Sequence, residues 1–127
     1  MTVLDLSTSS LREVNSELQS ASTGDFVVEN PQGVHALACG LDSAVTVRID
    51  GPVGYYCAGM NQHSNVFVDG NAGTGLAENI MSGTVTVSGS AGQSAGATGH
   101  GGLVVVHGDA SARCGISMKG VDIVVGG

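Results

Sequence analysis

Aromatic and basic residues are scarce in this sequence. Its 127 residues include no Trp, two Phe and two Tyr, and four Lys or Arg stand against 11 Asp or Glu, giving a net charge of −7. So few cations cannot form the basic patch that nucleic acid or an anionic membrane surface requires, so neither is an expected partner. The first ten residues have no basic start and no long apolar run, so we expect neither a signal peptide nor a membrane span. The expected location is the cytoplasm.

Cysteine is the next scarce residue type. Cys39, Cys57 and Cys114 are an odd number and lack CxxC spacing, which favours reduced, buried thiols over a disulfide framework or a zinc site. A catalytic thiol would need a nearby His or cation, and the sequence supplies none reliably.

Glycine, in contrast, is abundant and periodic. The chain has 21 glycines, and five of them recur with a 19-residue period. These five are Gly51, Gly70, Gly89, Gly108 and Gly127. Such a period indicates a repeat architecture rather than scattered turns.

β-branched residues keep step with these glycines. Two positions before them stand Ile49, Val68, Val87, Val106 and Val125, and four positions before them stand Val47, Val66, Val85, Val104 and Ile123. Apolar residues alternating two apart before a Gly are typical of a strand with one buried face. The alternation therefore predicts one strand in each repeat.

A 19-residue unit is too short for a strand, a helix and two loops, but it suits one coil of a solenoid. We therefore predict an all-β fold, a single-stranded right-handed parallel β-helix, over residues 47–127. Adjacent coils would lie about 4.8 Å apart, with valines and alanines stacked inside. The periodic glycines would supply positive φ angles or allow one coil to approach the next closely.

Residues 1–46 lack the period and are predicted to form an N-terminal cap and an irregular first coil. Ser10 followed by Glu13 indicates a capping box, with a short helix to about residue 19. Strands are predicted at residues 2–6 and 26–28. At the other end the fifth strand reaches residue 127 without a cover, so we expect either a longer chain or a partner over that edge.

Side chains with catalytic potential do not assemble into a motif. No GxxxxGK[ST] phosphate loop is present, and the register keeps His63 and His100 about two coils apart, so no metal site is predicted. His35 and His107 are expected at the surface. Asp50 and Asp69 share one register, either as a solvated edge or as a stripe facing a partner. No catalytic, cofactor-binding or metal-binding residue is predicted.

The segment 54–63 is the first candidate for a contact surface. It holds both tyrosines, a methionine and three polar side chains. Tyr and Met are enriched at protein interfaces, although the tyrosines could equally cover a bend. The candidate contact residues are Tyr55, Tyr56, Met60, Asn61, Gln62 and His63.

The wording of the repeats resembles a known family. VFVDGNAGTGLAENIMSG, VTVSGSAGQSAGATGHGG and VVVHGDASARCGISMKG are similar to the glycine-repeat β-helix domain at the C-terminus of the glutamate synthase large subunit. GYYCAGMNQ and DLSTSSLREVN are similar to the stand-alone B subunit of N-methylglutamate synthase (methylamine–glutamate N-methyltransferase). The C subunit of formylmethanofuran dehydrogenase is a more distant likeness. Because members of this group are longer, the resemblance also implies that the chain continues past residue 127.

This resemblance implies a non-catalytic scaffold subunit. Its expected partners are a class II glutamine amidotransferase subunit and an FMN-binding subunit of glutamate-synthase type, which would carry FMN and an iron–sulfur cluster. The expected product is glutamate or N-methylglutamate. The alternative is a stand-alone β-helix enzyme of acyltransferase or formylmethanofuran-dehydrogenase-subunit type, but left-handed acyltransferase helices have a six-residue period, and this chain has 19.

Overall fold

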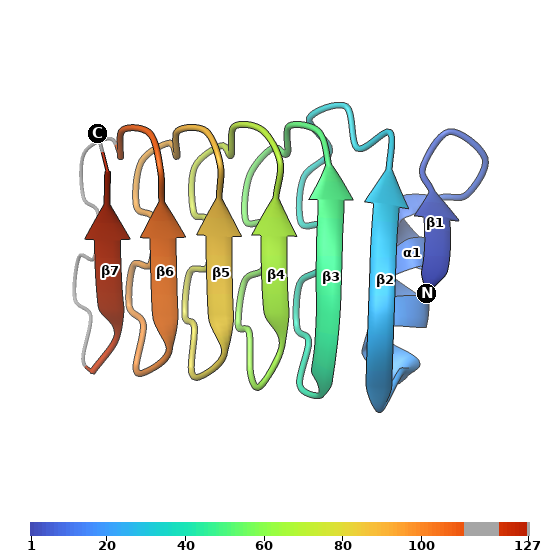
Figure 1. Cartoon of the computed structure of the whole chain (residues 1–127), viewed down its shortest axis with the longest axis horizontal. Helices are drawn as coiled ribbons and strands as arrows, with labels where there is room; N and C mark the ends of the chain where they lie inside the picture. The colour runs from blue at the N-terminus through green and yellow to red at the C-terminus, as the bar shows by residue number, and fades with distance from the viewer. Residues whose placement is uncertain (111–119, 127) are drawn as a thin grey trace.

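The computed structural model describes residues 1–110 and 120–126, which form a parallel β-solenoid with one short helix (Figure 1). Seven strands lie side by side in chain order, and every neighbouring pair is parallel. They are β1 (Thr2–Asp5), β2 (Thr23–Glu29), β3 (Ala44–Asp50), β4 (Asn65–Val68), β5 (Thr84–Val87), β6 (Leu103–Val106) and β7 (Asp122–Val125). The predicted fold class is confirmed.

The strand registers confirm the 19-residue coil and show where it changes. Val47 lies opposite Val66, and Val66 lies opposite Val85, so each pairing follows the 19-residue period. The earlier steps are longer, because Phe26 lies opposite Val47 and Thr2 lies opposite Phe26. The sheet continues across residue 46, so the division between a cap and a repeat region remains an interpretation of the sequence pattern.

The inward residues of the strands form the two predicted ladders, and β2 extends each ladder by one residue that was not predicted. The buried members are Phe26, Val47, Val66, Val85 and Val104 in one ladder and Val28, Ile49, Val68, Val87 and Val106 in the other. In β7 the prediction was wrong in part, because Val125 is 40% exposed and Ile123 is only partly buried. A ladder position is buried by coils on both sides, and within the described residues β7 pairs with β6 alone.

The periodic glycines serve both predicted purposes. Gly51 and Gly70 have φ angles of +145° and +154°, which disfavour other residues. Gly108 lies close to the preceding coil, since a Cβ there would be 2.8 Å from the carbonyl oxygen of Gly89. Gly127 falls outside the described residues.

Helix α1 (Leu11–Ser20) begins with the predicted capping box. The Glu13 amide donates to Ser10 Oγ at 3.1 Å, and the Ser10 amide donates to Glu13 Oε1 at 3.0 Å. Val14 and Leu18 are buried against the core. Within the described residues α1 is the one helix, and its ten residues are too few to cross a membrane.

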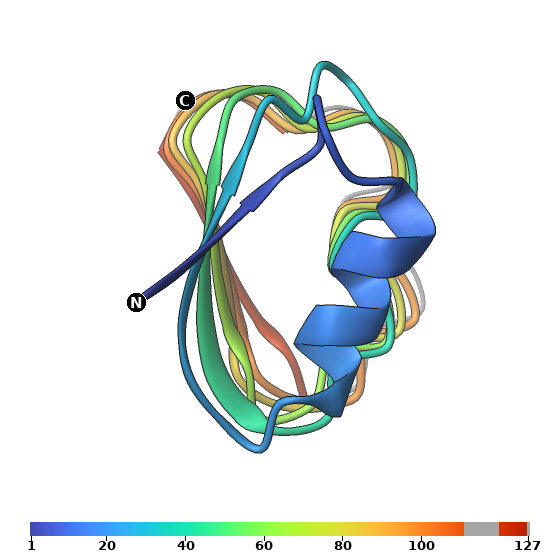
Figure 2. The same ribbon diagram turned by 90° about the vertical axis from the view of Figure 1, so that its right-hand side faces the viewer.

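Helix α1 takes the place of a preceding coil on the side opposite the sheet (Figure 2). Asn15 Nδ2 donates to the Ala36 carbonyl at 2.9 Å, and Asn15 Oδ1 accepts from the Ala38 amide at 2.8 Å. Gln19 Nε2 donates to the Cys39 carbonyl at 2.8 Å. Side chains of α1 thus form hydrogen bonds with backbone groups that would otherwise bond to a preceding coil.

The side of the solenoid opposite the sheet, here called the turn face, consists in the described coils of residues 54–63, 73–82 and 92–101 (Figure 2). Short bridges link its coils through Val53, Ala72, Ala91 and Ala110, the alanine register seen in the sequence. Tyr56, Gly75 and Ser94 share one register, and all three have positive φ angles. Gly75 is the one glycine among these three residues. It is the feature of the sequence that indicates a left-handed backbone position in this register.

Candidate functional site

Five of the six predicted contact residues are at least partly exposed on the turn face. Tyr55 is 52% exposed, Tyr56 48% and Met60 50%. His63 is also exposed, and Gln62 is half-buried. Three large apolar or aromatic side chains thus reach solvent on one short segment. Side chains of this kind are enriched in protein interfaces.

Glycines of the next coil fix the positions of the two tyrosine rings. A Cβ at Gly75 would lie 2.5 Å from Tyr56 Cδ1, and a Cβ at Gly73 would lie 3.1 Å from Tyr55 Cδ1. Each ring therefore rests on a position where a larger residue would displace it. Each tyrosine thus packs on the next coil and is still about half exposed.

His35 joins this aromatic group, and the sequence did not place it there. Its ring centroid lies 4.6 Å from that of Tyr55, and His35 Nδ1 accepts from the Tyr55 amide at 2.8 Å. Tyr55 and Tyr56 meet edge to face at 6.3 Å. His35 belongs to one of the longer coils that precede the strict 19-residue repeat. Counting 19 residues back from Tyr55 therefore does not lead to His35.

Asn61 is fully buried, so the sequence-based proposal that it contacts a partner does not hold for the described structure. Its Nδ2 donates to the carbonyls of Ser64 at 2.8 Å and Ser82 at 2.9 Å, while its buried Oδ1 has no hydrogen-bond partner. Asn61 therefore joins two coils from inside. Ile80 occupies the same position one coil later, and that apolar residue was the signal for an inward side chain.

The remaining polar residues of the segment contact the next coil. Gln62 Nε2 lies 3.1 Å from Met81 Sδ, and the His63 amide donates to Ser82 Oγ at 2.8 Å. Met81 is 47% exposed, so it extends the surface by one coil. Among residues 1–110 and 120–126 no three His, Cys, Asp or Glu side chains are placed to hold a metal ion.

The two described cysteines are poor nucleophiles. Cys57 is fully buried, and burial, with a smaller contribution from Cys39, raises its pKa to about 12. Cys39 is only partly buried, less than predicted, but burial also raises its pKa above the ordinary value. A thiol reacts as the thiolate, so neither group is activated at neutral pH. Cys114 lies outside the described residues.

Cys57 is therefore expected to resist alkylation in the folded protein. With a pKa of about 12, only about one molecule in ten thousand carries the Cys57 thiolate at pH 8, and the side chain is inaccessible. Iodoacetamide labelling at pH 8, followed by peptide mass spectrometry, should find Cys57 unmodified until denaturant is added. The denatured protein is the positive control. Labelling of native Cys57 at the denatured rate would contradict the buried assignment.

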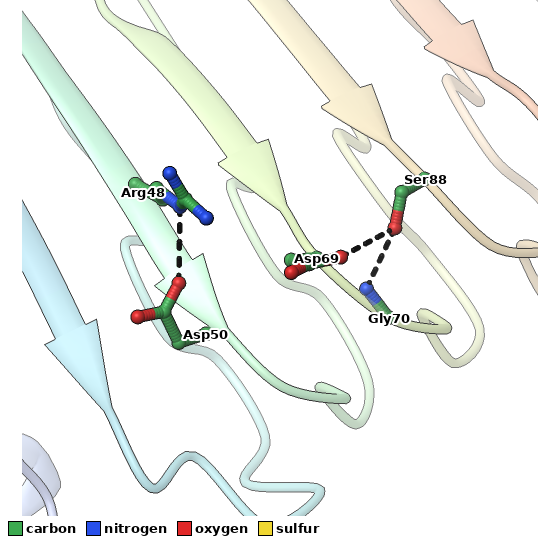
Figure 3. A network of polar contacts seen from close by, with 5 residues as sticks. All are labelled: Arg48, Asp50, Asp69, Gly70 and Ser88. Carbon is green, nitrogen blue, oxygen red and sulfur yellow. Dashed lines mark hydrogen bonds and ion pairs between the residues drawn. The ribbon is translucent and has the colours of Figure 1, made fainter.

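The in-register carboxylates Asp50 and Asp69 differ in their partners (Figure 3). Asp50 Oδ1 pairs with Arg48 Nε at 3.1 Å. Asp69 Oδ1 accepts from Ser88 Oγ at 3.1 Å, and that hydroxyl oxygen accepts from the Gly70 amide at 3.0 Å. Both residues are exposed at the ends of sheet strands, Asp50 as the last residue of β3 and Asp69 directly after β4, whereas the tyrosines belong to the turn face.

Comparison with known proteins adds one relative. The chain is similar to Protein GlxC of Rhizobium meliloti (strain 1021). The two are 55% identical over 65 residues, which is 48% of this chain and 28% of GlxC. This chain thus spans less than a third of the relative it matches. No protein-family model and no solved structure matches the chain.

Proposed function

We propose that the chain is a non-catalytic scaffold subunit of a glutamate-synthase-like complex of the N-methylglutamate synthase type. In this proposal it holds a class II glutamine amidotransferase subunit beside an FMN-dependent synthase subunit that also carries the iron–sulfur cluster. Ammonia released by the first would reach the second without escaping. The product would be glutamate or N-methylglutamate.

The observation that carries the proposal is the parallel solenoid with 19-residue coils, together with the sequence motifs of its repeats. Three successive repeats resemble the β-helix domain of glutamate synthases, and a 65-residue stretch is similar to GlxC. Fold alone does not assign a function, so the wording of the repeats provides the link to this family.

The chemistry of the described residues supports a scaffold rather than a catalyst. Its two described thiols have raised pKa values, and Asp50 and Asp69 are exposed and bound to neighbouring side chains. The turn face exposes Tyr55, Tyr56 and Met60, which suits a contact with a larger subunit.

Reconstitution tests the proposal. The chain is co-expressed with a class II amidotransferase subunit and an FMN-binding subunit of glutamate-synthase type, and synthesis is measured with glutamine and with free ammonia. We expect glutamine-driven synthesis to require the chain and ammonia-driven synthesis to proceed without it. Glutaminase turnover by the isolated chain, or a flavin spectrum retained by it after gel filtration, would overturn the scaffold assignment.

A pair of variants localises the contact. Tyr56→Ser with Met60→Ser removes two half-exposed side chains from the turn face and should weaken assembly by at least about tenfold. Arg12→Gln with Glu17→Gln, on the exposed surface of α1, is the matched control and should assemble normally. Equal assembly by both double variants would exclude the turn face as the contact.

A further inference from the structure

The outer face of the sheet carries a column of mostly apolar side chains, here called the apolar column. The strand registers align Val3, Val27, Arg48, Phe67, Thr86, Val105 and Val124 across all seven strands. Phe67 is 44% exposed, Val3 51% and Val124 54%. Five of these seven residues are apolar, and Arg48 and Thr86 interrupt the run. Exposed apolar side chains grouped on an open sheet face are a typical feature of a binding surface.

A column of carboxylates borders this apolar column. Asp5, Glu29 and Asp50 are aligned by the strand registers, and Asp69 follows them because its amide donates to the Ile49 carbonyl at 2.9 Å. Hydrogen bonds from Asn30 and then Ser7 hold the pKa of Asp5 below its usual value, which keeps this carboxylate charged. The border is therefore strongly acidic.

Within the described strands Arg48 is the only cation, and it is already paired. Its Nε lies 3.1 Å from Asp50 Oδ1 (Figure 3). Asp25 and Asp122 add negative charge on the other side of the apolar column. The face as a whole thus has a large excess of negative charge.

The apolar and acidic columns meet in a shallow groove of about 550 Å³. Its lining includes Arg48, Phe67, Asp69, Thr86, Ser88 and His107. Ser88 Oγ donates to the Asp69 carboxylate at one side of the groove and itself accepts from the Gly70 amide, so the carboxylate is held in position through Ser88. The groove therefore presents an exposed aromatic ring beside a positioned anion.

We propose that this outer sheet face binds a protein partner in which an apolar side chain is ringed by lysines or arginines. The apolar side chain would lie against Phe67 and Thr86, and the cations would pair with Asp50 and Asp69. A second copy of the chain is a poor occupant, because two faces with the same excess of negative charge repel each other. The proposal does not depend on a glutamate-synthase-like complex, so it can fail or hold separately from it.

A peptide probe tests both the charge and the location. The probe is a fluorescein-labelled peptide in which leucine and phenylalanine alternate with lysine, and its counterpart has glutamate in place of lysine. Fluorescence anisotropy should detect binding of the lysine peptide alone, and raising the salt concentration should weaken that binding.

Two double variants distinguish peptide binding at this face from nonspecific attraction of the cationic peptide to an acidic protein. Phe67→Thr with Asp69→Asn should weaken peptide binding at least about tenfold, and Thr is a compatible residue because Thr86 follows in the same column. Tyr56→Ser with Glu78→Gln removes the same kinds of group from the turn face and should leave binding within about twofold. Circular dichroism checks folding, and Asp69→Asn alone serves if the double variant unfolds.

Several outcomes would overturn the proposal. They are equal weakening by the two double variants, equal binding of the glutamate peptide, and absence of binding by the lysine peptide. A dimer in sedimentation equilibrium that dissociates on Phe67→Thr would assign the face to a second copy instead.

Discussion

Replacing Val87 with aspartate is expected to unfold the solenoid or bring it close to unfolding. Val87 has no exposed surface and stacks between Val68 and Val106, so the new carboxylate would be buried between two apolar neighbours. The loss should be about 3 kcal/mol or more, because an unpaired buried charge is among the most destabilising changes. That is a large share of the stability of a small domain.

Asp69→Asn is the control for this prediction. Asp69 points outward, and asparagine retains an oxygen that can accept from Ser88 Oγ. The change should stay within about 0.5 kcal/mol. Thermal unfolding followed by circular dichroism measures both variants. Equal melting temperatures would show that Val87 does not face the core.

The strict repeat made the central part of the fold predictable. Since each strand from β3 onward pairs with the next at the 19-residue period, a column read from the sequence is a stack in the structure. The same rule explains Asn61, whose equivalent in the next coil is the buried Ile80. Asn61 faces inward at the same position as Ile80, and two backbone carbonyls accept from its buried amide.

Contacts between coils could not be predicted from the sequence where the repeat length changes. The coils before β3 are longer, so the contact of His35 with Tyr55 could not be found by counting. The local signal of the helix remained readable, because the capping box of Ser10 and Glu13 involves only residues three apart. The tyrosine surface was predictable in composition, but its support by Gly73 and Gly75 required the packing of adjacent coils.

The outer face of the sheet was also only partly visible in the sequence. The register of Asp50 and Asp69 was clear, but the longer first coils concealed that Asp5 and Glu29 extend the same column. The inward ladders could be recognised in the sequence because β-branched residues recur at fixed distances before the periodic glycines. The alternate positions, which include Phe67 and Val124, keep the same 19-residue register, but their residue types differ from coil to coil and so did not indicate a surface.

Gly83→Ala tests whether close contact between coils is as important as the valine ladders. Gly83 has a φ angle of +85°, which costs a residue with a Cβ about 1–2 kcal/mol. A Cβ there would also collide with the Ser64 carbonyl and lie 2.7 Å from Asn61 Nδ2. Asn61 is buried and bonded to two carbonyls, so it has little room to move.

The expected cost of Gly83→Ala is therefore about 3 kcal/mol, the sum of backbone strain and overpacking. Gly33→Ala separates these two contributions, because Gly33 has a φ angle of +74° but no atom lies within 4 Å of the place its new methyl group would take. It should lose only about 1 kcal/mol, from the backbone alone. Urea unfolding of both variants gives the comparison. If the two lose equal stability, the approach of adjacent coils at Gly83 imposes no steric limit, and glycine is needed there for its φ angle only.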